Sequence, residues 1–378
     1  MLAAPERTLT PPPPCFHGGA FFEAIGVDFQ KLERRREVIN ADVLDAWFPP
    51  APKVISTIEE HLPWLLRTSP PTDCAGLLAA IAAARRLPRD CIAPGAGSSD
   101  LIYRAFRQWL RPDSRVLLLD PTYGEYAHVC REAVRCKVER FPLRRADGFA
   151  IDLDAWFAAA AKADLAVIVN PNNPTGRHLP RTELEAALAA LPTRTRVWVD
   201  EAYLEYVGQS ESLERFAVAT PNVVVCKSLS KVYALSGARA AYLAANAKTV
   251  RELSRWTPPW CVGLPAQVAA VAALADPDYY AARYRETRAF RESLARSLRA
   301  LDPRIEIVPG CANFVLCFLP DDWPTAAEIV ARCRNRDVFF RDPARMGSSL
   351  GPRALRFAVK DEATQSRMLK EFAAAARI

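Results

Sequence analysis

The sequence has little of the side-chain chemistry that metal sites and disulfide frameworks need. It contains four histidines, and its ten cysteines lie at irregular spacing without a Cys-x-x-Cys pair. Neither a zinc site nor a set of disulfide bonds can therefore be recognised from the spacing. We expect no bound metal, and thiols that are mostly reduced and fill the core of a cytoplasmic protein.

Long apolar runs and concentrated charge are missing as well. No stretch approaches the length needed to span a bilayer, and the opening MLAAPERTLTPPPPC has a proline run where a signal peptide needs a continuous apolar segment. The formal net charge of +7 is spread along the chain instead of forming a basic tail or helix. A small anionic ligand suits this balance as well as nucleic acid does. We expect a soluble protein, with neither membrane nor nucleic acid among its partners.

The composition is that of a large globular protein. With 378 residues, 50% of them hydrophobic, the chain can form one large or two ordinary domains. Residues 1–15 are expected to be a flexible, proline-rich lead-in. From about residue 75, helical patterns over 77–87 and 99–110 precede a series of short strand-like runs, which lie at 114–120, 136–141, 164–170, 195–200, 222–227 and 238–244.

Several of these strand-like runs are apolar throughout, as strands buried on both faces are. We therefore expect an α/β domain with a mostly parallel sheet covered by helices. Beyond about residue 265 the pattern changes to helices over 266–275 and 279–301 and a few strands, at 305–309, 313–319 and 355–360. This part, with some of the N-terminus, is expected to form a smaller α+β domain.

Polar residues follow the predicted parallel strands where those strands end. Asn173 lies in NPNNPTG after one run, Asp200 ends the next, and Lys231 follows a third in SLSKVYALSGAR. Ligands bind at the carboxyl ends of the strands in such sheets. The sequence therefore predicts that these three residues meet at one edge of the sheet.

The turn PGAGSSD opens a predicted helix with backbone N–H groups and hydroxyls that can hold a phosphate. Groups that could hold such a dianion from several sides come from Gly97, Ser98, Ser99, Ser228, Ser230 and Arg239. An aspartate at a strand end can pair with a ring nitrogen, an asparagine and a tyrosine can bond a phenolic oxygen, and a lysine can form a Schiff base. Phosphate, pyridine nitrogen, phenolic oxygen and aldehyde are the functional groups of pyridoxal 5'-phosphate (PLP).

The motifs NPNNPTG, VDEAY and SLSKVYALSGAR, in this order and at these separations, resemble the class I/II aminotransferase superfamily of fold type I. The resemblance covers nearly the whole chain. It implies a large PLP-binding domain with a mostly parallel seven-stranded sheet over residues 51–264 and a small α+β domain over 265–378. Residues 16–50 are implied to pack against the small domain and the active site. A homodimer is also implied, because the active sites of this superfamily lie at the subunit interface.

The resemblance assigns roles to individual residues. It implies that Lys231 forms the Schiff base, that Asp200 pairs with the pyridine nitrogen and that Tyr123 stacks on the ring; these three are the expected catalytic residues. Asn173 and Tyr203 are implied to contact the ring oxygen. The expected cofactor ligands at the phosphate end are Ser98, Ser99, Ser228 and Arg239 by the resemblance, joined by Gly97 and Ser230 of the same motifs.

The substrate side of the site involves other segments. Arg356, in ALRFAVK, matches the arginine that binds the substrate carboxylate, and Arg341 in FFRDPAR is a second candidate. The segment NADVLDAWF should line the substrate pocket. Its two acids, Asp42 and Asp45, would suit a cationic group on the substrate.

Two branches of the superfamily are resembled at once. PTYGEY and VDEAYLEY resemble histidinol-phosphate aminotransferases, whereas the HGG motif at residues 17–19, PPWCVG and PGCANF resemble threonine-phosphate decarboxylases. Both relatives carry Tyr-Pro-Asp where this chain reads Ser69-Pro70-Pro71. We expect a PLP-dependent aminotransferase acting on a small amino acid, phosphorylated or cationic. A decarboxylase or related lyase is the alternative, because the same lysine serves both reactions.

Each of these residues also has a simpler explanation. Asp200 could cap a helix and Asn173 could occupy a turn. Arg356 and Arg341 could pair with surface acids, and Lys231 alone could be a solvated surface residue. The functional prediction therefore depends on the motifs occurring together. A catalytically silent, ligand-sensing relative fused to a DNA-binding module is the alternative from another class, and the intact lysine argues against it.

Overall fold

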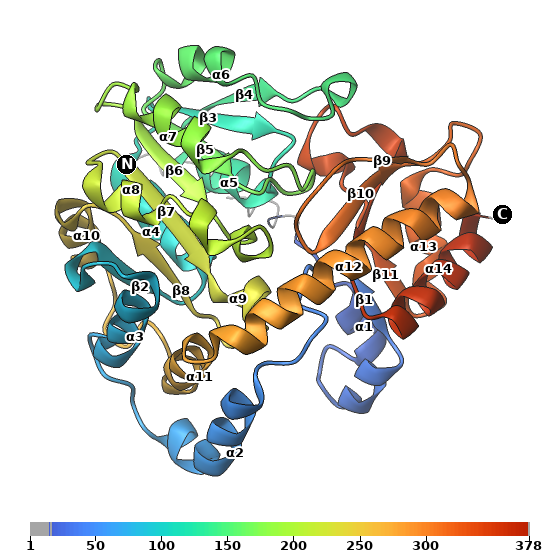
Figure 1. The fold of residues 1–378 in the computed structure, drawn as a ribbon, viewed down its shortest axis with the longest axis horizontal. Helices are drawn as coiled ribbons and strands as arrows, with labels where there is room; N and C mark the ends of the chain where they lie inside the picture. Colours follow the sequence, from blue (N-terminus) through green and yellow to red (C-terminus); the bar gives the residue numbers. More distant parts are fainter. Residues whose placement is uncertain (1–14, 16, 377–378) are drawn as a thin grey trace, which may run out of the picture.

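The larger part of the molecule is built on a seven-stranded sheet, in a computed structural model that describes residues 15 and 17–376. The strand order is β2-β8-β7-β6-β5-β3-β4 (Figure 1). The strands are β2 Ile92–Gly95, β3 Arg115–Asp120, β4 Lys137–Pro142, β5 Leu165–Val169, β6 Arg196–Asp200, β7 Val223–Ser228 and β8 Ala241–Ala244. Only β8 among them runs opposite to its neighbours, so the predicted mostly parallel sheet is confirmed.

Helices cover both faces of this sheet, which explains why its strands are apolar at nearly every position. Leu117 and Leu119 of β3 pack to one side, and Val116 and Leu118 pack to the other. The first face is covered by α3 Ala75–Arg85, α6 Leu153–Ala160, α7 Arg181–Ala189, α8 Glu214–Ala219 and α11 Leu264–Leu274. The second face is covered by α4 Ser98–Trp109, α5 Gly124–His128, the π-helix η3 Val129–Val134 and α10 Ala247–Ser254.

The smaller part contains two short sheets. An antiparallel sheet joins β9 Glu306–Ile307, β10 Phe314–Phe318 and β12 Ala354–Ala358. A second, parallel pair joins β1 Ile39–Ala41 of the N-terminal segment to β11 Val338–Phe340. The helices here are α1 Phe21–Ile25, α13 Ala326–Arg334 and α14 Glu362–Ala376. The N-terminal segment thus lies against the smaller part, while the predicted domain boundaries stay a prediction.

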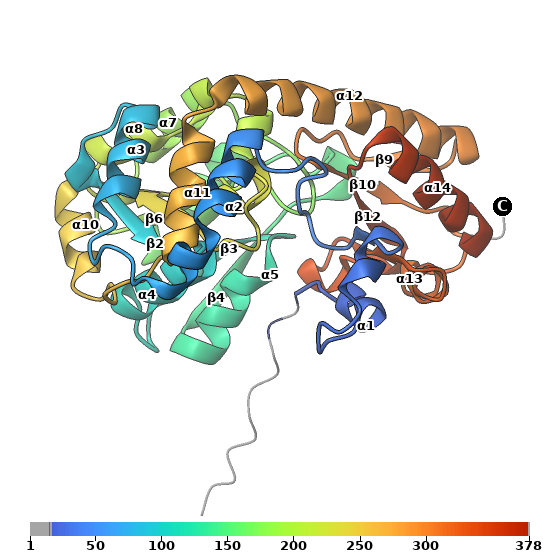
Figure 2. The ribbon, with the colours of Figure 1, turned by 90° about the horizontal axis from the view of Figure 1, so that it is seen from below.

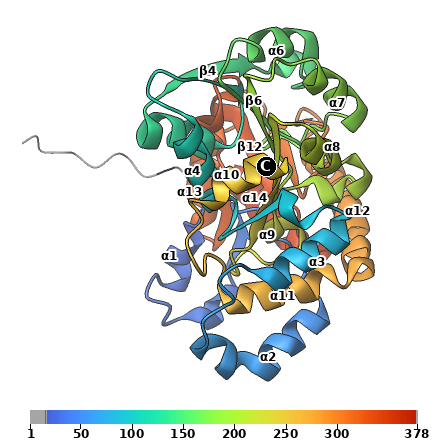
Figure 3. The same cartoon turned by 90° about the vertical axis from the view of Figure 1, so that its left-hand side faces the viewer.

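Three further helices complete the fold, and one of them connects the two parts. The long helix α12, Pro277–Leu301, runs from the large body to the smaller one (Figures 1 and 2). Helix α2, Pro52–Arg67, lies beside α11 at the periphery (Figure 3). The shortest, α9 Leu229–Val232, follows β7 and carries Lys231. The 3-10 turns are η1 Leu32–Arg36, η2 Arg89–Cys91, η4 Arg145–Asp147, η5 Leu204–Tyr206, η6 Gln209–Glu211, η7 Ala344–Met346 and η8 Gly351–Arg353.

Three further features predicted from the sequence concern the N-terminal lead-in, membrane-spanning helices and metal sites. Apart from Cys15, the predicted lead-in 1–15 lies outside the described residues. Within residues 17–376, no helix is long and apolar enough to cross a membrane. The same part of the chain shows no group of three or more His, Cys, Asp or Glu side chains arranged to hold a metal ion.

Candidate active site

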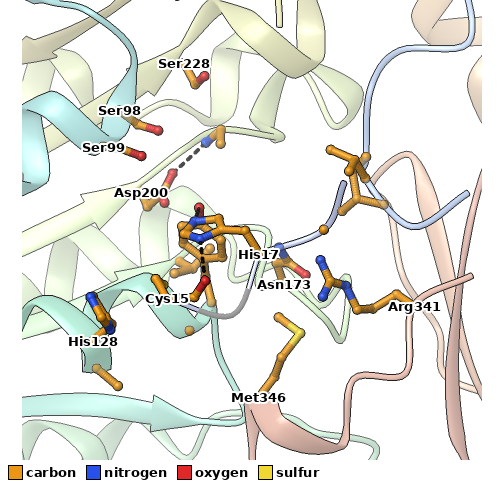
Figure 4. Close-up of a pocket in the computed structure, with 18 of the residues that line it drawn as sticks. Cys15, His17, Ser98, Ser99, His128, Asn173, Asp200, Ser228, Arg341 and Met346 are labelled. Carbon is orange, nitrogen blue, oxygen red and sulfur yellow. Dashed lines mark hydrogen bonds between the residues drawn. The ribbon is translucent and has the colours of Figure 1, made fainter. Parts of the chain in front are cut away.

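A cavity of about 440 Å³ lies at the carboxyl edge of the large sheet, between the two parts of the molecule. Figure 4 shows Ser98, Ser99 and Ser228 at one end of it and Arg341 at another. Of the residues predicted from the sequence, those that line the cavity are Asp42, Ser98, Ser99, Tyr123, Asn173, Asp200, Tyr203, Ser228, Ser230, Lys231, Arg239, Arg341 and Arg356. Gly97 and Asp45 are not among the lining residues, but both contact residues that are.

Serine hydroxyls and an arginine converge at one end of the cavity. Ser98 begins α4, and no side chain among the described residues caps this helix end, so its first N–H groups are available to an anion. Gly97 has φ +89°, and a Cβ there would collide with the Arg239 guanidinium. The Ser230 hydroxyl is buried and has no hydrogen-bond partner among the described residues. This donor set fits a phosphate group.

Asp200 is a buried carboxylate at the end of β6. Its two oxygens accept hydrogen bonds from the Tyr126 hydroxyl at 2.6 Å and the Ala202 amide at 3.0 Å. Trp198 Nε1 donates to the same tyrosine oxygen at 3.0 Å, which holds that hydroxyl in place. Burial raises the pKa of Asp200, and these two donors only partly oppose the effect. Such a carboxylate would be stabilised by a protonated ring nitrogen beside it.

The Lys231 amine points into the cavity and is already paired. Its Nζ lies 2.8 Å from Asp45 Oδ1, and its side chain is 20% exposed. Burial acts to raise the pKa of Asp45, but the charge of Lys231 together with hydrogen bonds from Lys231 and Ser236 outweighs it, so the pKa is lowered. Asp42 is likewise engaged, with its Oδ1 2.8 Å from Arg341 Nε. The two acids that we expected to be available to a cationic substrate group therefore each have a basic partner within the protein.

Arg356 and Arg341 lie side by side across an antiparallel bridge. Arg356 Nη1 donates to Asn173 Oδ1 at 2.6 Å and its Nη2 to the Asp42 carbonyl at 2.7 Å. Its Nε is buried without a hydrogen-bond partner among the described residues. Burial, aided by the charge of Arg341, lowers the pKa of Arg356 to about 10. An anion bound beside Arg356 and Arg341 would accept a hydrogen bond from Arg356 Nε. It would also reduce the repulsion between the two positive charges.

Sequence reasoning missed a hydrogen-bond network around Glu125, which follows Tyr123 in α5. The Glu125 side chain is 2% exposed. It accepts hydrogen bonds from Tyr123 at 2.6 Å and Ser99 at 2.9 Å, and His17 Nε2 lies 3.2 Å away. His17 Nε2 also lies 2.9 Å from the Tyr123 hydroxyl. The signal was present in the PTYGEY and HGG motifs, but nothing in the sequence indicated that they meet.

His17 should remain protonated well above neutral pH. Hydrogen bonds to Cys15 and Glu125 raise its pKa from 6.5 to about 10, against the opposing effect of burial. Because the folded-state value is raised, the stabilisation is complete below pH 6.5 and is lost as the pH rises through about 10. An NMR titration of the imidazole protons, assigned with His17→Gln, should show no His17 transition before that range. A transition near 6.5 would contradict the ion pair with Glu125.

A second region of the cavity, which we call the outer lobe, was also not predicted. It is lined by His128, Arg131, Glu132, Arg140, Arg345 and Met346. Figure 4 shows His128 and Met346 on this side, away from the serines. Burial lowers the pKa of Arg140, and the charge of Arg131 adds to the effect, while Asp120 opposes it. The outer lobe thus brings several basic groups together with one lining carboxylate.

Comparisons with known proteins agree with this arrangement. The "Aminotransferase class I and II" profile matches residues 52–372. Histidinol-phosphate aminotransferase 2 of Gluconobacter oxydans is 34% identical over 301 residues, covering 78% of this chain and 80% of that protein. The histidinol-phosphate aminotransferase of Sinorhizobium meliloti in complex with PLP has a TM-score of 0.82 at 23% identity, covering 94% and 96% of the two chains. L-threonine-O-3-phosphate decarboxylase of Porphyromonas gingivalis has a TM-score of 0.78 at 22% identity, covering 90% and 100%.

The sequence match and the cavity lead to the same conclusion. The structural neighbours, at these identities, show the fold. The family profile spans most of the chain, and the cavity offers donors for a phosphate and a buried carboxylate suited to a ring nitrogen. The chain belongs to the class I and II aminotransferases, and it is an enzyme of fold type I whose cofactor is PLP.

Proposed function

We propose that this aminotransferase acts on a small amino acid whose side chain carries a phosphate-like anion, and that Lys231 bonds the cofactor. The proposal is supported by the observation that all the required groups line a single cavity. One cavity is lined by the lysine, the groups suited to the cofactor phosphate, the neighbouring Arg356 and Arg341, and the arginines of the outer lobe. Two anion sites in addition to the cofactor phosphate suit a substrate with two acidic groups.

The cofactor would be held by residues from several strand ends. We assign the phosphate to Ser98, Ser99, Ser228, Ser230 and Arg239, with Gly97 leaving room for the guanidinium. Asp200 would pair with the ring nitrogen, Asn173 and Tyr203 would contact the ring oxygen, and Tyr123 would stack on the ring. When bound, PLP supplies an electron-accepting ring that stabilises negative charge at the substrate's α-carbon.

The remaining chemistry falls to the protein's own side chains. Arg356 binds the substrate carboxylate and so orients the bonds of the α-carbon. Lys231 Nζ, when free, takes the proton from that carbon and can return it on another atom. Asp45, 2.8 Å from Nζ, stabilises the ammonium that forms. Binding, orientation and proton transfer are thus assigned to different side chains of one cavity.

An anionic side chain is favoured over a cationic one by the charges that line the cavity. Asp42 and Asp45 are engaged by Arg341 and Lys231. The outer lobe contains several basic side chains, and the positive charge of Arg131 helps to lower the pKa of Arg140. A phosphate or carboxylate at the far end of the substrate would relieve that repulsion.

Decarboxylation is the second candidate, because the pair of anion sites would allow the substrate to bind in a second orientation. If the far anion of the substrate occupied the Arg356 and Arg341 site, the α-carboxylate would lie elsewhere in the cavity. The bond between the α-carboxylate and the α-carbon could then be the one aligned for cleavage. Because the same lysine serves both outcomes, the seating of the substrate decides between them.

A panel of amino acids distinguishes the two reactions. We expect an amino acid with a phosphorylated side chain to convert bound PLP to pyridoxamine phosphate without release of carbon dioxide. Neutral and cationic analogues of the same length should react at least about 10-fold more slowly in kcat/KM. Release of carbon dioxide without pyridoxamine phosphate would establish the decarboxylase. A preference for the cationic analogue would overturn the assignment of an anionic substrate.

Removing a charge from the outer lobe should weaken binding of the preferred substrate. For Arg140→Gln we expect KM for the anionic amino acid to rise about 5- to 10-fold, because a hydrogen bond to a charged group is lost. The KM for a neutral amino acid should stay unchanged. Arg144→Gln, an exposed arginine outside the cavity after the same strand, is the matched control. An equal rise for both variants would show that the outer lobe does not bind the substrate.

We also propose that the protein is a homodimer. Helix α2 exposes four large apolar side chains, Ile55, Leu62, Trp64 and Leu66, and α2 packs beside α11 (Figure 3). Exposed apolar side chains that cluster on one element are typical of interaction surfaces. Light scattering during gel filtration should give twice the mass of 41.9 kDa. A monomer at all concentrations would contradict the assignment.

A further inference from the structure

The short helix that carries Lys231 leaves several carbonyl groups at its end without backbone hydrogen-bond donors among the described residues. Helix α9 has four residues, and the last four carbonyls of any helix lack an intrahelical donor. Leu229 O accepts from the Tyr233 amide at 3.2 Å. Ser230 O accepts from the Leu235 amide at 3.2 Å. Within residues 17–376 the next three carbonyls have no backbone donor of this kind, and their partners are side chains from elsewhere in the fold.

Those three consecutive carbonyls accept hydrogen bonds from tyrosine hydroxyls. The pairs are Tyr206 to Lys231 O at 2.8 Å, Tyr284 to Val232 O at 2.9 Å and Tyr280 to Tyr233 O at 3.3 Å. We call Tyr206, Tyr280 and Tyr284 the tyrosine clamp. Every carbonyl of the lysine turn, residues 229–233, thus has a donor.

The members of the tyrosine clamp support one another. Tyr280 and Tyr284 lie one turn apart on α12, and Tyr206 belongs to η5. The ring centroids of Tyr206 and Tyr284 are 5.3 Å apart, and those of Tyr280 and Tyr284 are 6.5 Å apart. Burial raises the pKa of Tyr206 and of Tyr284 well above the usual value. These hydroxyls therefore stay protonated and remain donors at any working pH.

The same helix also holds the segment that lies opposite Lys231. The Ala51 amide donates to the Tyr280 hydroxyl at 3.1 Å, and Trp47 Nε1 donates to Thr287 Oγ1 of α12 at 2.8 Å. Asp45, on the same segment, is the residue whose carboxylate contacts the Lys231 amine. Helix α12 is thus the common attachment of the lysine backbone and of its side-chain partner. The Tyr280 hydroxyl joins both, because it accepts from the Ala51 amide and donates to Tyr233 O.

We propose that the tyrosine clamp positions Lys231 for proton transfer by fixing the backbone of the lysine turn to α12. The proposal rests on the proposed role of Lys231. Core packing alone would require the rings of these tyrosines but not their hydroxyls. A positioning role requires the hydroxyls, because they are the groups that contact the lysine turn.

Substitution by phenylalanine separates the two possibilities, because it removes the hydroxyl and keeps the ring. For Tyr206→Phe and for Tyr284→Phe we expect kcat to fall about 10-fold while KM changes less than about 2-fold, since orientation and not substrate binding is lost. In the cofactor-free protein, amide hydrogen exchange over residues 229–236 should be faster in both variants. Exchange in β5 and β6 should be unchanged.

Tyr279→Phe is the matched control. Tyr279 also lies on α12, but its hydroxyl donates to Pro49 O at 2.8 Å and not to the lysine turn. Unchanged kcat and unchanged exchange in both clamp variants, or equal effects in Tyr279→Phe, would overturn the proposal. Circular dichroism would show which variants fold, and only those would be compared. Either Tyr206→Phe or Tyr284→Phe alone is enough to test the proposal. Exchange in the cofactor-free protein tests the clamp even if Lys231 proves not to be the residue that bonds the cofactor.

Discussion

Lys231→Ala should lower kcat/KM for transamination by about 10⁴-fold, because the variant loses the group that moves the proton at the α-carbon. The protein should still fold, because the Lys231 side chain is 20% exposed in a cavity and is not part of the core. Reduction of the wild-type enzyme with borohydride should attach the cofactor to the peptide that contains residue 231, and mass spectrometry should detect this adduct. The variant should give no adduct on that peptide.

Lys248→Ala is the control for this experiment. Lys248 is exposed at the start of α10, outside the cavity. Its substitution should leave both the adduct and the activity unchanged. An adduct that forms on another lysine of the wild-type enzyme would disprove the assignment of Lys231. Restoration of part of the activity by a small added amine would support proton transfer as the missing function.

Asp200→Asn should have the second largest effect, a fall of about 10²- to 10³-fold in kcat/KM. The asparagine is nearly the same size, so binding of the phosphate end should change little. What is lost is the negative charge that would keep the ring nitrogen protonated. Absorbance titration of the bound cofactor, together with kcat and KM, measures both consequences. Activity within about 2-fold of wild type would contradict the proposed pairing with the ring nitrogen.

The same variant makes a prediction about stability without cofactor. Because burial raises the pKa of Asp200 above 3.8 in the folded protein, its contribution to stability is complete at low pH. It is lost as the pH rises through the raised value. In cofactor-free protein, the free energy of unfolding of wild type relative to Asp200→Asn should therefore decline with pH over this range. A constant difference between the two proteins would show that the carboxylate is not strained by burial.

The large sheet and its functional edge could be predicted from the sequence because the information is local. All six strand-like runs predicted before residue 265 appear as strands, and Asp200 ends one of them as expected. Strand β2 was missed, since Ile92–Gly95 contains a proline and a glycine that read as part of the PGAGSSD turn. The pair of β1 with β11 was missed as well, because three-residue strands carry almost no periodicity.

The contacts inside the site could not be predicted because their partners are far apart in sequence. Lys231 and Asp45 are separated by 186 positions, and Arg356 and Asn173 by 183. The motifs identified each residue type and its strand end, but not which charge would face which. The contact between Asp45 and Lys231 is one that the motifs did not indicate, and the role of Asp45 toward a substrate stays a prediction. The outer lobe was missed for a different reason, since Arg140 lies in a strand that carries no motif.

The reversed direction of β8 bears on how the protein would retain its cofactor. Parallel strands deliver their functional residues after they end, but β8 runs the other way, so the residues before its start lie at the same edge. Lys231 and Arg239 therefore both belong to the one connection from β7 to β8, eight positions apart. With the proposed assignments, that connection would set the spacing between the lysine that bonds the aldehyde and the arginine that binds the phosphate. A single residue inserted between Lys231 and Arg239 would change the distance between the two side chains that would hold the ends of the cofactor. Retention of the cofactor would therefore depend on the length of this connection as much as on its chemistry.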